Sequence, residues 1–203
     1  MKPPCETKGK LLQVALRLIW ENSYGAVGVE EICREAGVKK GSFYYFFPSK
    51  SDLTVAAMEA HWEDQRAALD RIFSPQTPPL ARIAAYCQSV CERQEAKKKE
   101  YGKVCGCPMV TLGAELSTQD EAIRRKTAEI MGRYTAYFEA ALRDAMAQGL
   151  SHCGDPGATA RRLFAFSQGL LLQAKVHNDL SPLADLRPGM AQMLGLQARS
   201  VAA

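Results

Sequence analysis

Cationic and hydroxyl-bearing side chains gather in the segment 39–50, at a spacing that suits contact with a nucleic acid. The segment holds three lysines and no acidic residue, whereas the whole 203-residue chain has a formal net charge of only +4. Lysines bind phosphate oxygens, glycine and serine allow a helix to approach a groove closely, and tyrosine hydroxyls form hydrogen bonds. These residue types predict an interface for double-stranded DNA, with the following candidates: Lys39, Lys40, Gly41, Ser42, Tyr44, Tyr45 and Lys50.

A helix-turn-helix over about residues 28–47 would position these side chains. Residues 29–36 form an amphipathic segment, and Gly37 follows as the residue type that most readily adopts the left-handed conformation closing a helix. The lysines then stand at the start of the second helix, where backbone N–H groups also favour phosphate. The alternative is a small helical hairpin whose lysines only face solvent.

Local signals mark the ends and the buried face of this motif. Gly28 stands at an N-cap position without a capping side chain, and Ser49 is placed to cap the following helix. We expect Phe43 and Phe47 to pack into the core rather than to face a partner.

Hydrophobic periodicity predicts an all-α fold of about nine helices, with no strand and no internal repeat. The expected helices cover residues 6–23, 29–36, 39–47, 49–73, 80–99, 108–117, 120–148, 158–176 and 182–196. We expect a DNA-binding domain over residues 1–50 and a helical regulatory and dimerisation domain over residues 51–203. The first helix carries apolar residues at helical spacing, namely Leu12, Ala15, Leu16 and Ile19.

The run A-G-V-x-K-G-S-x-Y-x-x-F-x-S-K over residues 36–50 resembles the DNA-binding signature of the TetR family of repressors. The resemblance implies a homodimer that pairs through its last two long helices and binds palindromic operator DNA. Gly28 departs from the family pattern, which usually has serine or threonine there. Apolar residues on more than one face of 158–176 support pairing: Leu163, Phe164, Phe166, Leu170, Leu171 and Leu172.

The resemblance also assigns roles to single residues. It implies that Tyr44 and Lys50 bond phosphates, and that Lys39, Ser42 and Tyr45 reach base edges or nearby phosphates. Family members often carry histidine at Tyr45 and at the residue after it, so the resemblance does not identify the operator sequence.

A second reactive feature is Cys107, which directly precedes Pro108 and the helix that starts there. A thiol at a helix N-terminus is expected to have a lowered pKa, and the nearby Lys103 favours the thiolate in the same way. Such a thiol is a target for oxidants and electrophiles.

This part of the chain is similar to the NemR-like branch of the family. The similarity implies that Cys107, next to Cys105, is a sensing thiol whose modification releases DNA, and that Lys175 is its charge partner. The matching segments are Gly106-Cys107, Leu112-Gly113-Ala114-Glu115, Leu172-Gln173-Ala174-Lys175 and Pro182-Leu183.

Simpler interpretations of the cysteines remain open. Cys33 is expected to fill space within its helix, and Cys87 and Cys91 share one helix face that suits a core. Alternatively, Cys87, Cys91, Cys105 and Cys107 supply four thiolates to a metal site, although their spacing is weakly diagnostic. We therefore expect neither a metal nor another cofactor.

A reversible small-molecule effector is a further alternative. Several predicted helices carry residues suited to an apolar cavity with a few polar groups. The candidates are Tyr86, Met109, Tyr134, Tyr137, Phe138 and Gln168.

Other function classes find little support. A thiol enzyme using Cys107 would need a Cys-His-Asn/Asp arrangement, and no such pattern, phosphate loop or paired-carboxylate spacing is present. A helical interaction module without DNA binding does not explain the lysines of 39–50. The N-terminus reads directly into a charged amphipathic helix, and no apolar run approaches about 20 residues, so we expect a cytoplasmic protein with reduced thiols and no membrane contact.

Overall fold

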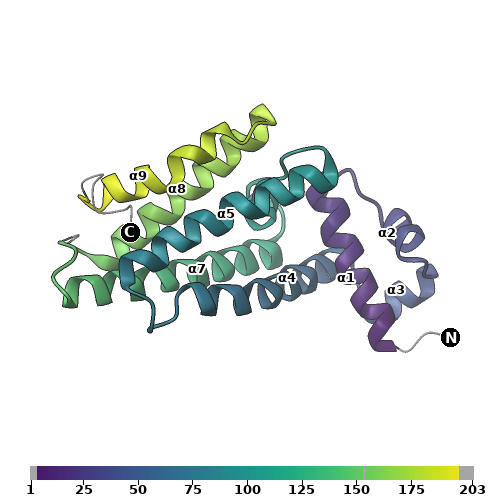
Figure 1. Ribbon diagram of the computed structural model, residues 1–203. Coiled ribbons are helices and arrows are strands. Elements are labelled where there is room, and N and C mark those ends of the chain that lie inside the picture. The colour runs from purple at the N-terminus through teal and green to yellow at the C-terminus, as the bar shows by residue number, and fades with distance from the viewer. Residues whose placement is uncertain (1–3, 153, 197–203) are drawn as a thin grey trace. The chain divides into compact units, whose positions relative to one another are not determined.

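The structure of the protein, a computed structural model, describes residues 4–152 and 154–196, and that part of the chain contains nine α-helices and no strand (Figure 1). The helices are α1 (Pro4–Glu21), α2 (Val29–Ala36), α3 (Lys40–Phe46), α4 (Lys50–Ile72), α5 (Pro79–Tyr101), α6 (Pro108–Leu116), α7 (Glu121–Ala147), α8 (Pro156–His177) and α9 (Leu186–Met193). The all-α prediction of about nine helices is confirmed. Over the described residues, none of these helices combines the length and the apolar character that crossing a membrane requires.

The last predicted helix, 182–196, differs in its beginning. The chain first forms a 3-10 turn, η1 (Ser181–Asp185), and only then the shorter α9. The backbone N–H of Leu183 bonds to the carbonyl of Leu180 at 2.9 Å, three residues back, which is the tighter spacing of a 3-10 turn.

Close packing groups the helices into two compact units. The first unit contains the chain up to Gln65 together with Pro108–Ile130, and the second contains Arg66–Cys107 and the chain from Met131 onward. Helices α4 and α7 each contribute to both units. The functional division predicted at residue 50 is a different kind of boundary, and it stays a prediction.

In the first unit, α1, α2 and α3 share one apolar core. Phe43 and Phe47 are buried, as predicted. Of the predicted apolar stripe of α1, Ala15 and Ile19 are buried, whereas Leu12 and Leu16 are only half-buried, and Leu11 and Leu18 are buried in addition. A helix turns about 100° per residue, so a shift of one position moves the stripe without changing the helix.

The ends of these helices follow the predicted capping chemistry. Gly37 has φ 65° and its N–H bonds to the carbonyl of Arg34 at 3.1 Å, which closes α2. Gly28 begins α2 without any side-chain cap. The Ser49 hydroxyl accepts a hydrogen bond from the Asp52 N–H at 3.0 Å at the start of α4.

In the second unit, aromatic rings and the ion pair of a buried arginine fix the helices. The rings of Tyr86 and Phe138 meet edge to face with centroids 4.8 Å apart. Arg82, whose side chain is 4 % exposed, pairs with Asp144 at 2.6 Å and donates to the carbonyl of Thr77 at 2.7 Å. Helices α8 and α9 lie side by side.

Candidate nucleic-acid interface and effector site

The α3 helix presents the predicted DNA-contacting residues on its outer surface. The side chains of Tyr44 and Tyr45 are 50 % and 79 % exposed, whereas Phe43 between α3 and α1 is fully buried. Lys39 stands at the N-cap of α3, and both it and Lys40 are exposed. Gly41 is exposed and Ser42 half-buried on the same short helix. Cations, hydroxyl groups and a helix N-terminus therefore share one surface.

Lys40 has an intramolecular partner on this surface. Its ammonium donates to the carboxylate of Glu30, in the first turn of α2. The hydrogen bond and the opposite charge raise the pKa of Lys40 and lower the pKa of Glu30. The sequence analysis missed this pair, because it joins two helices across the turn at Gly37.

Lys50 holds the loop between α1 and α2, residues 22–28. Its ammonium donates to the carbonyl of Tyr24 at 2.8 Å and to that of Val27 at 2.9 Å. It also lies 3.8 Å from the centroid of the Tyr24 ring. Burial lowers the pKa of Lys50. The predicted phosphate contact of Lys50 stays a prediction, and the DNA-free chain gives the same ammonium a structural role.

Glu115 reaches this α1–α2 loop from α6. Its two carboxylate oxygens accept hydrogen bonds from the backbone N–H groups of Tyr24, at 3.1 Å, and Gly25, at 2.9 Å. Glu115 belongs to the segment Leu112-Gly113-Ala114-Glu115 that is similar to the NemR-like branch, but its contact with the α1–α2 loop could not be predicted from the sequence. The only available signal was an acid at the end of an otherwise apolar helix, PMVTLGAEL.

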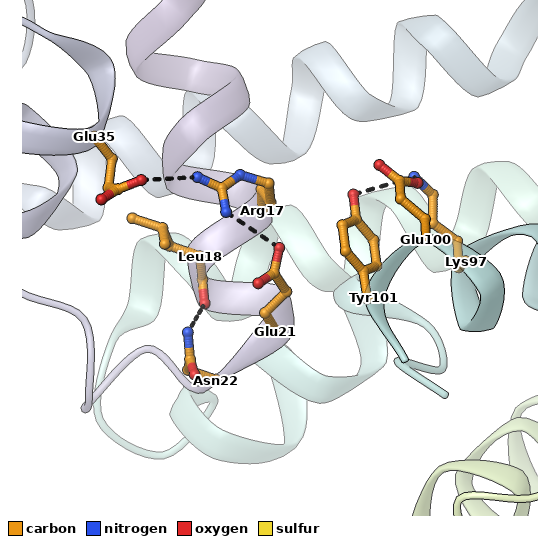
Figure 2. Close-up of polar contacts among 8 residues, drawn as sticks. All are labelled: Arg17, Leu18, Glu21, Asn22, Glu35, Lys97, Glu100 and Tyr101. Atoms are coloured by element: carbon orange, nitrogen blue, oxygen red, sulfur yellow. Dashed lines mark hydrogen bonds and ion pairs between the residues drawn. The ribbon is translucent and has the colours of Figure 1, made fainter. Parts of the chain in front are cut away.

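Ion pairs at the surface lie on α1, which precedes the α1–α2 loop, and at the end of α5, which precedes residues 102–107. On α1, Arg17 donates to Glu21 at 3.3 Å and to Glu35 of α2 at 3.4 Å, and Figure 2 shows the guanidinium between the two carboxylates. Separately, at the end of α5, Lys97 donates to Glu100 at 2.8 Å and to the hydroxyl of Tyr101 at 3.3 Å (Figure 2).

The segment 102–107, which we call the thiol loop, is held by two neutral amides. The Gln94 side chain donates to the carbonyl of Gly106 and accepts from its N–H, both at 3.2 Å. The Asn178 side chain accepts from the N–H of Val104 at 2.9 Å. Gly106 has φ 69°, and a Cβ there would lie 3.4 Å from Cδ of Lys175. The stem of Lys175 therefore contacts the loop between its two cysteines.

The two cysteines of the thiol loop differ in exposure and surroundings. Cys105 is buried, at 2 % exposed, while Cys107 is half-buried. The pKa of Tyr134 is raised by burial and, to a lesser extent, by the negative charge of Cys107. Burial and a smaller contribution from Cys107 likewise take part in raising the pKa of Tyr86 to about 12.

Other predicted effector residues are distributed around the second unit. Phe138 contacts the Tyr86 ring, and the Tyr137 hydroxyl donates to Asp70. The Gln168 side chain donates to the Ser167 hydroxyl at 3.3 Å, while its buried Oε1 has no partner among the described residues. Met109 is buried on α6, in the first unit.

The remaining thiols do not form the four-thiolate site considered above. The Cys87 sulfur lies 3.5 Å from that of Met190, the Cys91 thiol donates to the Leu183 carbonyl at 3.7 Å, and Cys105 turns toward its own loop. Nowhere in the described part of the chain do three or more His, Cys, Asp or Glu residues form a group suited to a metal. Cys33 is buried, as predicted.

Two family models match successive parts of the chain. Residues 11–57 match the family described as bacterial regulatory proteins, tetR family. Residues 79–190 match the tetracyclin repressor-like C-terminal domain. The second match alone covers more than half of the chain, and together they include α3 and the thiol loop.

Individual relatives agree with these matches. The transcriptional regulator AcuR of Cereibacter sphaeroides is 30 % identical over 175 residues, with 85 % of this chain and 78 % of the relative covered. The transcriptional repressor NemR of Escherichia coli is 29 % identical over 180 residues, covering 88 % of each chain. The crystal structure of E. coli NemR in its reduced form superimposes with a TM-score of 0.83, covering 95 % of this chain and 98 % of that one at 27 % identity.

Proposed function

The chain belongs to the TetR family, and it is therefore a DNA-binding transcriptional regulator rather than an enzyme; we propose that it is a homodimeric repressor released from its operator by a thiol-reactive signal at Cys107. Family membership implies operator DNA as one partner and an effector acting on the C-terminal domain as the other. The observation that carries the proposed signal is the half-buried Cys107 thiol at the end of a loop that the Gln94 and Asn178 side chains hold.

The proposed DNA contacts are those of α3 and its N-cap. Their support is the exposure of Lys39 and Tyr45 on a helix whose opposite side is buried by Phe43. The wild-type chain can select its own binding sequence from a pool of random duplexes. Affinity for the enriched duplex is expected to fall steeply as salt rises. If Lys39 binds phosphate, Lys39→Ala is expected to reduce the slope of log affinity against log salt concentration by about 1. Tyr45→Ala instead is expected to relax sequence preference if Tyr45 reads a base.

We propose that α8 carries the main part of the homodimer interface predicted through the last two long helices. Leu172 and Val176 are 56 % and 71 % exposed on one side of α8, while Leu163 and Leu171 are buried within the second unit. Two such apolar side chains one turn apart suit a twofold contact. Leu172→Asp with Val176→Asp is expected to give monomers in sedimentation experiments. Leu150→Asp, at another exposed leucine, is the control and leaves the dimer intact.

The proposed signal is covalent. With an electrophile such as N-ethylmaleimide, the Cys107 thiolate attacks one carbon of the ring C=C bond, an S–C bond forms as the π bond breaks, and the neighbouring carbon takes up a proton from water. With hydrogen peroxide, the sulfur attacks one oxygen, the O–O bond breaks, and sulfenic acid and water result. Burial raises the pKa of Cys87 to about 12 and also raises that of Cys91, so those thiols stay protonated and react slowly near neutral pH.

The test combines DNA release with adduct mapping. N-Ethylmaleimide is expected to release wild-type protein and Cys105→Ser from the enriched duplex, with the first adduct on Cys107 by mass spectrometry. Cys107→Ser is expected to stay bound under the same treatment. If Cys107→Ser is released as readily as wild type, the thiol mechanism is wrong.

The second candidate signal is a reversible apolar ligand, with purely structural cysteines. An open groove of about 530 Å³ in the second unit supports it. Its walls are mainly apolar and come from α5 and α9, including Leu80, Ile83, Met190 and Leu194. Release of Cys107→Ser by a compound that leaves no adduct would favour this candidate.

A further inference from the structure

We propose that Glu115 is a positioning residue for DNA binding, which acts from α6 by fixing the α1–α2 loop that carries Tyr24 and supports Lys50. Glu115 lies outside the helix-turn-helix and about 90 residues from the loop it holds. The inference rests on the proposed DNA binding by α3, and it does not depend on the nature of the effector.

Local hydrogen bonds in the α1–α2 loop, such as that from the Val27 N–H to the Tyr24 carbonyl at 3.4 Å, leave the N–H groups of Tyr24 and Gly25 to an acceptor from another helix. Gly28, at the N-cap of α2, has no side chain to accept a backbone N–H. Within the loop, the Ser23 hydroxyl accepts only from Ala26, at 3.1 Å. The N–H groups of Tyr24 and Gly25 therefore take their acceptor from Glu115. The direction in which the chain enters α2, and hence α3, is set from α6.

Helix α6 is a firm base for this contact. Pro108, Thr111 and Leu112 of α6 line a narrow cleft with Ile19 and Trp20 of α1. On its other side α6 lies so close to α7 that a Cβ at Gly113 would come within 2.6 Å of the Thr127 methyl group. Such close approach fixes α6 in the first unit, so the Glu115 carboxylate is held in place rather than swinging freely.

Glu115 and Lys50 act on the two ends of the same residue. The Tyr24 N–H donates to the Glu115 carboxylate and the Tyr24 carbonyl accepts from the Lys50 ammonium. Opposite charges at the donor and acceptor sides of one residue strengthen both hydrogen bonds. Loss of Glu115 is therefore expected to loosen Lys50 as well as the loop, at the beginning of α4.

The sign of the effect separates positioning from plain electrostatics. Glu115 is negative, and removing a negative charge from a DNA-binding unit strengthens binding if only long-range repulsion matters. Removing a carboxylate that holds the loop weakens binding instead. Glu115→Gln tests this, because glutamine keeps the size of the side chain but offers one acceptor oxygen to two N–H groups.

The measurement is the affinity of the full-length chain for the duplex selected by wild type and for a random-sequence duplex of equal length. Glu115→Gln is expected to bind both about tenfold more weakly, because it loses a hydrogen bond to a charged acceptor. Glu115→Asp keeps the carboxylate on a shorter side chain, so its affinity for DNA is expected to lie between those of wild type and Glu115→Gln. Glu121→Gln is the charge-matched control, because Glu121 pairs with Arg124 on its own helix at 2.6 Å. This variant is expected to bind both duplexes as tightly as wild type or more tightly.

Hydrogen exchange of the Gly25 amide gives a second readout that needs no DNA. It is expected to become about tenfold faster in Glu115→Gln and to stay unchanged in Glu121→Gln. The proposal is wrong if Glu115→Gln binds DNA as tightly as Glu121→Gln, or if the Gly25 amide keeps its wild-type exchange rate. Should Glu115→Gln not fold, the same two outcomes apply to Glu115→Asp.

Discussion

The α1–α2 loop and the thiol loop are both held by side chains from helices, but charged side chains hold the first and neutral side-chain amides hold the second. Charged groups hold the first: Glu115 binds its N–H groups and Lys50 its carbonyls. Neutral amides hold the second: Gln94 pairs with both polar groups of Gly106, and Asn178 accepts from Val104. Charged attachments respond to ions and phosphates, whereas neutral amides respond little to salt. The first would suit the proposed DNA-binding side, and the second would suit the proposed thiol sensor.

Removing the amide attachment is expected to have the largest effect. Gln94→Leu leaves the buried N–H and carbonyl of Gly106 without partners, so we expect a loss of about 3 kcal/mol in the free energy of unfolding. Urea denaturation followed by circular dichroism measures it. Gln88→Leu, at an exposed position of the same helix, is the control and is expected to change stability by less than about 0.5 kcal/mol. A loss below about 1 kcal/mol for Gln94→Leu would contradict the comparison.

The second largest effect is expected from alanine at the loop glycines, which should lower stability more in the thiol loop than in the α1–α2 loop. Gly106 and Gly102 both have positive φ, so alanine at either costs about 1–2 kcal/mol of backbone strain. Gly106→Ala is the larger, because its Cβ also meets the Lys175 stem, while nothing lies within 4 Å of a Cβ at Gly102. Gly25→Ala, in the α1–α2 loop, has no such strain and is expected to stay within about 0.5 kcal/mol of wild type. Thermal denaturation of the three variants decides whether their order is correct.

Salt is expected to distinguish the attachments at a smaller scale. Glu115→Gln is expected to lower stability by about 1 kcal/mol at low ionic strength, since the carboxylate is half-buried, and by less in about 1 M salt, where the Debye length is about 3 Å. The loss in Gln94→Leu is expected to be the same at both salt concentrations. Equal salt dependence of the two variants would remove the distinction drawn between the loops.

The exposed ion pairs beside each loop are expected to matter least. Arg17→Ala and Lys97→Ala each break pairs that water screens, so both are expected to change the free energy of unfolding by less than about 0.5 kcal/mol. A loss above about 1 kcal/mol for Arg17→Ala would mean that charge alone, without bonding to the backbone, holds α1 to α2. The same urea titrations serve as the measurement.

Periodic patterns explain which parts of the fold were predictable. The alternation of Phe43 and Phe47 inward with Tyr44 and Tyr45 outward follows from the helical repeat, and the structure agrees with it. Helix ends at Gly37 and Ser49 also follow from local chemistry.

The contacts that hold the two loops left no such pattern. Glu115 meets Tyr24 across 91 residues, and a single side-chain bond to a backbone group recurs at no fixed spacing. The bonds from Lys50 to two backbone carbonyls could not be predicted either, because the type and position of Lys50 say nothing of the carbonyls beside it. On α8, one run of apolar residues divides into buried Leu171 and exposed Leu172, which only packing against α9 and η1 decides.

Trp20, which lines the cleft between α1 and α6, is an intrinsic fluorescent probe of the first unit. The chain has two tryptophans, Trp20 and Trp62, and both belong to the first unit. The indole of Trp20 lines that cleft and meets the His61 ring edge to face at 6.0 Å, while Trp62 is buried. Tryptophan emission therefore comes entirely from the unit that carries α3. A shift of its wavelength when Cys107 is modified would record, without any attached dye, the arrival of the signal at the DNA-binding side.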